Sequence, residues 1–411
     1  MDSGPADLLV RCLSARVEPA FSDQVGRYSS NDWHEVVDMA AHHGLVPLLF
    51  KRLKESDARA CVPADAWKGL RSAYFASADR NARLYRELRT VLRCLRSSGI
   101  PVIVLKGAYL AEAVYGDVAL RPICDVDLMV PRAELPRAQA VLLDMGCVQQ
   151  ESEDIESYCR REPHLPAIFM RDLVIELHWT IASPTGPFRV DTAGLWDRAH
   201  PATIAGVGFL ALSPEDLLLH LCLHFGHEHH LARLRFLYDI AETIHRFRGE
   251  MGWAQVVHSA REWGAARYVG LTLHLARSML GTGVPDDVLE QLVPGGLGQR
   301  LLEAARDCAL TQTGYDPRVP RPFFDEWRAE SLGDKARLPW KRVFLSRDEM
   351  AARYPASRDS RHFYFYYALR LRDVIRNFGG PHALSRGRLM VRSRGRGREV
   401  LLVNWLKSGK P

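Results

Sequence analysis

The sequence has few of the features that mark secreted, membrane or disulfide-bonded proteins. Its eight cysteines form no C-x-x-C pair and are scattered along 411 residues, a usage typical of free thiols in a reducing compartment. The opening stretch, MDSGPADLLVRCLSARVEPAF, lacks the charged start and apolar run of a signal peptide. No apolar stretch approaches the length of about 18 residues that a membrane span needs. We therefore expect a cytoplasmic protein without a membrane segment.

The main body of the chain also lacks an excess of charge of either sign. The formal net charge is +6, and residues 386–398, RGRLMVRSRGRGR, contain six arginines and no acid. Subtracting these six charges from the six of the whole chain leaves none, so a long nucleic-acid partner is not expected. Hydrophobic residues make up 47% and charged residues 25%, which is the balance of a globular protein. The length allows two or three domains.

Hydrophobic spacing divides the chain into helical ends and a central region that contains strands. Apolar residues at helical spacing predict helices before residue 98 and again from residue 213, where Ser213 and Pro214 form a start signal. Between them, short β-branched runs alternate with helical segments, which is typical of an α/β or α+β unit. The predicted central elements are strands at 101–107, around 126–130, 166–171 and 173–181, and a helix at 132–147 that has Pro136 in its first turn.

Two aspartates lie within the apolar strand RPICDVDLMV (121–130). Side chains alternate along a strand, so Asp125 and Asp127 share one face. Glu176 lies in a second apolar strand, LVIELHWTI, where an unpaired carboxylate would be costly. If the two strands are neighbours, the three acids converge on a site suited to Mg²⁺ and a phosphorylated substrate. The alternative is a chance D-x-D pattern in which Arg121 pairs with Asp125.

A cluster of histidines offers a second possible metal site. His220 and His224 are four residues apart, as zinc ligands on a helix are. The segment HLCLH lacks the glutamate of a zinc hydrolase, and HEHHL places Leu231 where the second ligand would stand. The other interpretation is that His220 and His224 pack between helices while His229 and His230 are exposed.

Three segments together resemble the uncharacterised nucleotidyltransferase-like family of the polymerase-β superfamily. They are LKGAYLAEAVYGDVALRPICDVDLMV (105–130), VIELHW (174–179) and PEDLLLHLCLHFGHEHHLARLRFLYDIAETI (214–244). The resemblance extends from about residue 30 to 375, including VFLSRDEMAARYP and FYYALRLRDVI. It implies an α+β fold, in which a small mixed-sheet polymerase-β-like core is flanked by N- and C-terminal helical domains.

The resemblance also implies roles for individual residues. Asp125 and Asp127 would bind both metal ions, and Glu176 would complete one metal site. Lys106 and Arg121 would face the triphosphate, with Gly107 allowing the backbone to approach it. In the helical domain, Arg235 and Asp239 would face the active-site cleft. The Gly-Ser turn usual in the superfamily is Gly107-Ala108 here, so a phosphate-binding hydroxyl is missing and Lys106 is expected to replace it.

The resemblance further implies an Mg²⁺-dependent nucleotidyltransferase, with Mn²⁺ as the alternative ion and an NTP as co-substrate. The acceptor would be a hydroxyl or phosphate of a small molecule or peptide, and natural-product pathways are the setting associated with the family. Two alternatives remain, a nucleotide-binding regulator without turnover and an enzyme that modifies protein side chains. The regions that we predict are an N-terminal helical region (1–98), a catalytic core (99–185), a helical domain (186–312), a C-terminal helical extension (313–384) and a basic flexible tail (385–411).

Overall fold

A computed structural model describes residues 4–14, 21–149, 154–310, 401–402 and 404–406. The predicted helical extension at 313–384 and nearly all of the basic tail lie outside the described residues. All the helices and strands named below belong to one compact unit, Met1–Gly314 with Leu402–Pro411. In the described part of the chain no helix is both long and apolar enough to cross a membrane.

The N-terminal region is helical, as the sequence predicted. The capping box of Ser29 and Asp32 starts α3. Gly44 ends it in the left-handed conformation, with φ of 70°, and Pro47 lies in the first turn of the next helix. The elements are α1 (Pro5–Leu13), α2 (Phe21–Val25), α3 (Ser30–His43), α4 (Val46–Lys54), the 3₁₀ turn η1 (Asp57–Cys61) and α5 (Ala64–Ser97).

A seven-stranded mixed sheet forms the centre of the fold, in the order β3-β4-β5-β2-β1-β7-β6. The two strands that carry the predicted acids, β2 and β5, are parallel neighbours, and β4 and β5, at the predicted strands 166–171 and 173–181, form an antiparallel hairpin. The strands are β1 (Ile103–Val104), β2 (Val126–Met129), β3 (Val148–Gln149), β4 (Ile168–Met170), β5 (Leu173–His178), β6 (His200–Ile204) and β7 (Val207–Ala211).

The sheet continues past residue 185, where the sequence predicted no further strand. The hairpin of β6 and β7 turns at Ala205 and Gly206, which both have positive φ, as the two central residues of a type I′ turn do. Strand β7 then pairs with β1 in parallel. Pro201 lies inside β6, and a proline within an apolar run argues against a strand. Here it is tolerated because β6 is the edge strand of the sheet.

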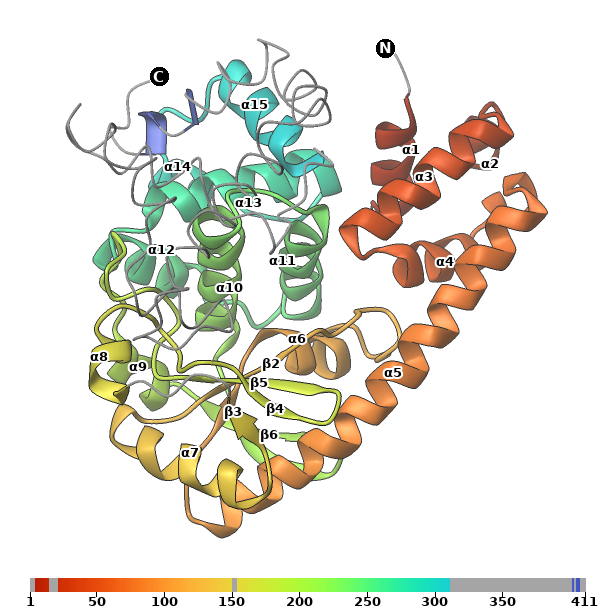
Figure 1. Cartoon of the computed structure of the whole chain (residues 1–411). Coiled ribbons are helices and arrows are strands. Elements are labelled where there is room, and N and C mark those ends of the chain that lie inside the picture. The colour runs from red at the N-terminus through yellow and green to blue at the C-terminus, as the bar shows by residue number, and fades with distance from the viewer. Residues whose placement is uncertain (1–3, 15–20, 150–153, 311–400, 403, 407–411) are drawn as a thin grey trace, which may run out of the picture. The chain divides into compact units, whose positions relative to one another are not determined.

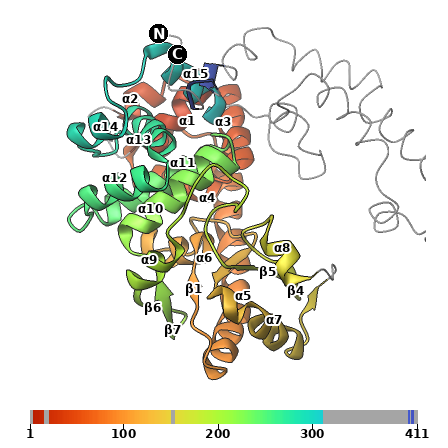
Figure 2. The same ribbon diagram turned by 90° about the vertical axis from the view of Figure 1, so that its left-hand side faces the viewer.

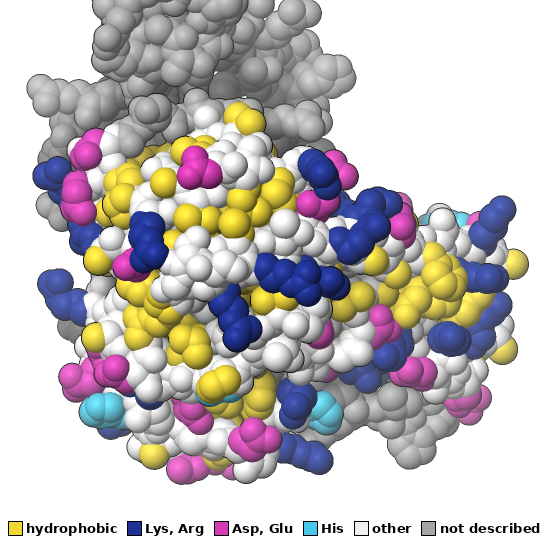
Figure 3. All heavy atoms as spheres, turned by 90° about the horizontal axis from the view of Figure 1, so that it is seen from below, with side chains coloured by type: hydrophobic (Ala, Val, Ile, Leu, Met, Phe, Trp, Pro, Cys, Tyr) yellow, Lys and Arg dark blue, Asp and Glu magenta, His cyan; other side chains and the backbone are white. Residues whose placement is uncertain are grey.

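Helices pack on the sheet and form a separate bundle beside it (Figures 1 and 2). Helix α5 contacts α7, β5 and β7. Its solvent face carries Arg86, Arg89, Arg93 and Arg96, all exposed, and Figure 3 shows basic side chains gathered on the face seen from below.

The remaining elements are α6 (Lys106–Tyr109), the π-helical turn η2 (Leu110–Val114), the 3₁₀ turn η3 (Arg132–Glu134), α7 (Leu135–Asp144), α8 (Ile155–Cys159), α9 (Thr192–Asp197), α10 (Pro214–Leu223), the π-helical turn η4 (His224–Glu228), α11 (Leu234–Arg246), α12 (Trp253–Glu262), α13 (Ala266–Leu280), α14 (Asp286–Leu292) and α15 (Gln299–Leu310).

Candidate functional site

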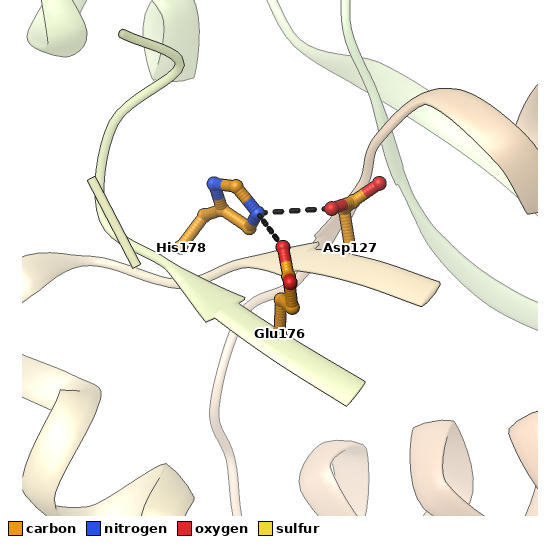
Figure 4. Close-up of side chains that lie close together, drawn as sticks. All are labelled: Asp127, Glu176 and His178. Atoms are coloured by element: carbon orange, nitrogen blue, oxygen red, sulfur yellow. Dashed lines mark hydrogen bonds and ion pairs between the residues drawn. The ribbon is translucent and has the colours of Figure 1, made fainter. Parts of the chain in front are cut away.

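Strands β2 and β5 bring two of the predicted acids together with a histidine. Asp127 and Glu176 are register partners across the parallel pair, and His178 lies two residues after Glu176, on the same face. His178 Nε2 is 3.0 Å from Asp127 Oδ1 and 3.5 Å from Glu176 Oε2 (Figure 4). The ligand atoms of the three side chains all lie within 4.8 Å of one another. Of the three acids that the sequence predicted to converge, the structure brings Asp127 and Glu176 together and adds the imidazole of His178.

Lys106 places an ammonium group beside the same carboxylate. Strand β1 ends at Val104 and α6 begins at Lys106, whose φ of 33° is unusual for a residue other than glycine. Its Nζ lies 3.4 Å from Asp127 Oδ1, and 11% of its side chain is exposed. Backbone pairing holds the turn in place, because the Leu105 N–H donates to the Asp127 carbonyl at 2.9 Å. The strand-to-helix turn therefore directs a buried cation at the centre of the site.

The charges of the site perturb one another strongly. Burial alone would lower the pKa of Lys106, but Asp127 and other acids outweigh it and raise that pKa. Burial would likewise raise the pKa of Asp127, but Lys106 and His178 hold it well below the usual range. The pKa of His178 is about 9, because hydrogen bonds to Asp127 and Glu176 outweigh its burial. Such concentrated perturbation is typical of functional sites.

Asp125 lies outside the convergent group. It is an exposed residue that comes just before β2, and the candidate metal-binding group among the described residues consists of Asp127, Glu176 and His178. Neighbouring protein atoms nevertheless desolvate its carboxylate in part. This desolvation and the charge of Asp127 raise the pKa of Asp125. Asp125 also contributes to the raised pKa of Lys106. Its charge therefore belongs to the electrostatics of the site, while its role as a ligand stays a prediction.

Arg121 pairs with Asp239, not with Asp125 as the alternative interpretation of the sequence had it. Its Nε and Nη2 donate to the two carboxylate oxygens at 3.0 to 3.2 Å, and Tyr115 Oη donates to the same carboxylate at 2.8 Å. Only 7% of the Arg121 side chain and none of that of Asp239 is exposed. A Cβ on Gly107 would lie 2.9 Å from Arg121 Nη1. Glycine at position 107 therefore leaves room for the guanidinium group.

Arg235 and Asp239 both lie on α11, where they hold the segment that carries Arg121. Asp239 does so through the buried ion pair. Arg235 Nη1 donates to the Pro122 carbonyl at 3.4 Å, and its guanidinium lies 5.0 Å from the Phe236 ring centre. Within the described residues, the buried Arg235 Nε has no hydrogen-bond partner. These contacts position the loop before β2, and direct ligand contact by either residue remains a prediction.

The histidine cluster packs beside the acids. His224 Nε2 is 3.1 Å from His229 Nε2, and His229 stacks on Phe236 with ring centres 4.2 Å apart, so it is not exposed as the sequence suggested. Burial holds the pKa of His220 and His224 well below the ordinary value, which keeps these rings neutral. No zinc-type group of histidines is found in the part of the chain that the structure describes.

Two further residues near the acids were given no role from sequence. Glu228 ends η4, and its carboxylate lies 3.7 Å from His224 Nε2. Burial raises the pKa of Glu228, although the charges of Lys106 and His178 oppose that shift. His164 Nε2 lies 3.8 Å from Glu176 Oε2. In the sequence, Glu228 stands among the four histidines of residues 224–230. Neither that cluster nor His164 indicates which side chains face Lys106.

The donor set fits a divalent cation. Two carboxylates face each other from adjacent strands, and one imidazole nitrogen lies within 3.5 Å of both. Carboxylate and imidazole are the protein ligands of Mg²⁺, Mn²⁺ and Zn²⁺ in different proportions.

Two surface hollows of about 400 and 380 Å³ lie elsewhere, between the end of α5 and the β6–β7 hairpin. None of the residues that line these hollows belongs to the acid site.

Comparison with known proteins identifies a family. A family described as uncharacterised nucleotidyltransferase matches residues 29–281, more than half of the chain. Among solved structures, a solution structure of the antibiotic-resistance factor ANT(2'')-Ia is 16% identical, with a TM-score of 0.32 over 47% of this chain and 97% of that one. A crystal structure of ANT(2'')-Ia with adenylyl-2''-tobramycin is 15% identical, with a TM-score of 0.29 over 42% and 91%. No curated protein matches the sequence.

Proposed function

Because this chain belongs to the uncharacterised nucleotidyltransferase family, we propose that it transfers a nucleoside monophosphate from an NTP to an acceptor and releases pyrophosphate. The acceptor is a hydroxyl or phosphate group of a small molecule or peptide. The reaction depends on a divalent ion, Mg²⁺ or Mn²⁺, held by Asp127 and Glu176 with Asp125 at the edge of the site. The near-neutral main body of the chain favours an acceptor of this kind over a long nucleic acid.

The observation that carries this proposal is the pairing of Asp127 with Glu176 across parallel strands. The two carboxylates repel each other, and the backbone register keeps them together. Lys106 and His178 offset part of that repulsion. Loss of either cation would leave a carboxylate of the pair uncompensated, which is costly in a buried site. A triphosphate with a bound divalent ion would suit this site, because the carboxylates would bind the ion and Lys106 would bind a phosphate.

The chain's own groups would bind and orient the nucleotide. Lys106 Nζ, at the turn after β1, supports phosphate binding in place of the hydroxyl that Ala108 lacks. Arg121 Nη1 makes no hydrogen bond within the described residues and lies against Gly107. It is the one guanidinium nitrogen of Arg121 left for a phosphate oxygen, because Nε and Nη2 hold Asp239. When bound, a divalent ion would neutralise phosphate charge and stabilise the attacking and leaving oxygens.

The chemistry needs positioning and charge neutralisation more than covalent catalysis. The acceptor oxygen forms a bond to the α-phosphorus, and the bond from that phosphorus to the bridging oxygen breaks. Pyrophosphate leaves with the bonding electron pair. A carboxylate of the site accepts the proton of an acceptor hydroxyl, and Asp125 has the exposure and the raised pKa that suit such a role.

Mass spectrometry with a panel of NTPs tests the proposal. The full-length protein is incubated with Mg²⁺, one NTP at a time and a small-molecule extract, and products are searched for the added mass of a nucleoside monophosphate. We expect such products with wild type and with Asp144→Asn, an exposed acid at the end of α7, and none with Asp127→Asn. Nucleotide binding without any product would favour a regulator, and label on protein alone would favour a protein-modifying enzyme.

A further inference from the structure

His178 belongs to the acid site by geometry. It follows Glu176 by two residues in β5, so both side chains project from the same face of the sheet. Asp127 reaches the same point from the adjacent strand (Figure 4). His178 Nδ1 is buried and has no hydrogen-bond partner in the described part of the chain. Its Nε2 contacts with the two carboxylates and the neighbouring His164 ring, whose centre lies 4.9 Å away, orient the ring.

The distances from His178 Nε2 to the two carboxylates match the separation of ligands on one metal ion. Bonds from nitrogen or oxygen to a transition-metal ion are about 2.0–2.2 Å long, so two ligands about 90–110° apart are separated by roughly 3–3.5 Å. The distances from His178 Nε2 to Asp127 Oδ1 and Glu176 Oε2 are 3.0 and 3.5 Å. A single ion could contact all three side chains without a change in strand register.

We propose that His178 Nε2 is a metal ligand together with Asp127 and Glu176, and that it makes the site favour Mn²⁺ over Mg²⁺. The proposal rests on the proposed function for the presence of a divalent ion and adds the identity of a ligand. Mg²⁺ strongly prefers oxygen ligands, whereas imidazole nitrogen suits first-row transition metals. A site with one imidazole and two carboxylates therefore selects between the two ions.

The competing explanation is that His178 serves only as a positive charge that separates the carboxylates. In that case an incoming ion would displace the ring, and no metal–nitrogen bond would form. His164 provides a matched control for this question. Its Nε2 is 3.8 Å from Glu176 Oε2 and its ring centre is 4.9 Å from that of His178. Its Nδ1 lies 2.8 Å from the Leu165 carbonyl, and it is outside the convergent group.

Pulsed electron paramagnetic resonance of Mn²⁺ bound to the full-length protein tests the proposal without any need for turnover. We expect nitrogen coupling in wild type, with a changed coupling pattern after labelling histidine with ¹⁵N. The coupling should persist in His164→Asn and be lost in His178→Asn and His178→Gln. The preference for Mn²⁺ over Mg²⁺, from competition titrations, should fall about tenfold or more in both His178 variants, as loss of a group that supports a metal site usually costs.

The outcomes separate this proposal from the proposed function. Mn²⁺ that binds to wild type and not to Asp127→Asn, but shows no histidine coupling, would overturn the role of His178 and leave the metal-dependent site intact. Coupling lost in His164→Asn and kept in His178→Gln would also overturn it. Mn²⁺ binding that Asp127→Asn leaves unchanged would contradict the proposed site as a whole. Melting curves of the metal-free variants show whether each is folded. Because two different substitutions replace His178, the test can still be made if one of these variants does not fold.

Discussion

Replacement of Arg121 by alanine should destabilise the fold strongly, because Arg121 forms a buried, two-pronged ion pair with Asp239. Its side chain is 7% exposed and that of Asp239 is not exposed at all. Removal of one partner of a buried pair leaves an uncompensated charge and typically costs about 3–5 kcal/mol. Tyr115 Oη keeps its hydrogen bond to Asp239, which compensates only part of the loss. We therefore expect the free energy of unfolding to fall by about 3 kcal/mol or more.

Urea denaturation measures this loss, and the chain supplies a control of the same chemistry. Arg132 pairs with Glu156 at the surface, where the two side chains are 44% and 64% exposed. Exposed pairs contribute about 0–1 kcal/mol, so Arg132→Ala should change stability little. The double variant Arg121→Met/Asp239→Leu should regain much of the stability lost in Arg121→Ala, because it removes both charges.

The opposite pattern would refute this reasoning about Arg121. Stability within about 1 kcal/mol of wild type in Arg121→Ala, together with a large loss of NTP affinity, would mean that the guanidinium serves the nucleotide and not the fold. Equal losses in Arg121→Ala and Arg132→Ala would also contradict the argument, since it depends on the difference in burial.

Three further outcomes are expected. Lys106→Ala should weaken NTP affinity by about tenfold or more in titration calorimetry, and an affinity equal to wild type would exclude a phosphate-binding role. Gly107→Ala should cost about 1–3 kcal/mol in urea denaturation, because the new Cβ would lie 2.9 Å from Arg121 Nη1; an unchanged stability would show that the guanidinium moves freely. Between pH 7 and pH 5, His43 should lower the free energy of unfolding by about 2 kcal/mol. Burial lowers its pKa from 6.5 to about 4, so the unfolded state takes up the proton first as the pH falls. His43 Nδ1 accepts the Leu234 N–H. His43→Gln cannot titrate, so it should remove this share of the pH dependence in urea melts, while the buried His220 and His224, whose pKa is also lowered, keep theirs; an equal slope in the variant and wild type would contradict the assignment.

Strand alternation and turn signals predicted much of the fold around the acids. The pattern of RPICDVDLMV and LVIELHWTI placed Asp127 and Glu176 on strand faces, and the structure makes those strands parallel neighbours in direct register. The helix that starts with Ser213 and Pro214 is also confirmed, with the Ser213 side chain accepting from the Asp216 N–H. These features depend on local periodicity and capping, which the sequence displays directly.

Features that depend on contacts between distant segments could not be predicted in this way. The partner of Arg121 is Asp239, which follows it by 118 residues, and no local pattern connects the two. The edge strand β6, HPATI, was missed because it contains Pro201, and a proline argues against a strand. Strand alternation places His178 on the same face as Glu176. The distance from His178 Nε2 to Asp127 Oδ1, however, depends on how two strands far apart in sequence are aligned.

Pyrophosphate release measured in Glu176→Gln tests the central claim most directly. The substitution keeps the size of the side chain and removes one charge from the pair that β2 and β5 hold in register. With wild-type protein, Mg²⁺ or Mn²⁺, an NTP and acceptor extract, we expect divalent-dependent release. In Glu176→Gln we expect nucleotide binding to persist and the rate to fall by a factor of about a hundred or more, as loss of a key electrostatic group usually costs. Release at the wild-type rate in Glu176→Gln would contradict the assignment of this carboxylate to the reaction.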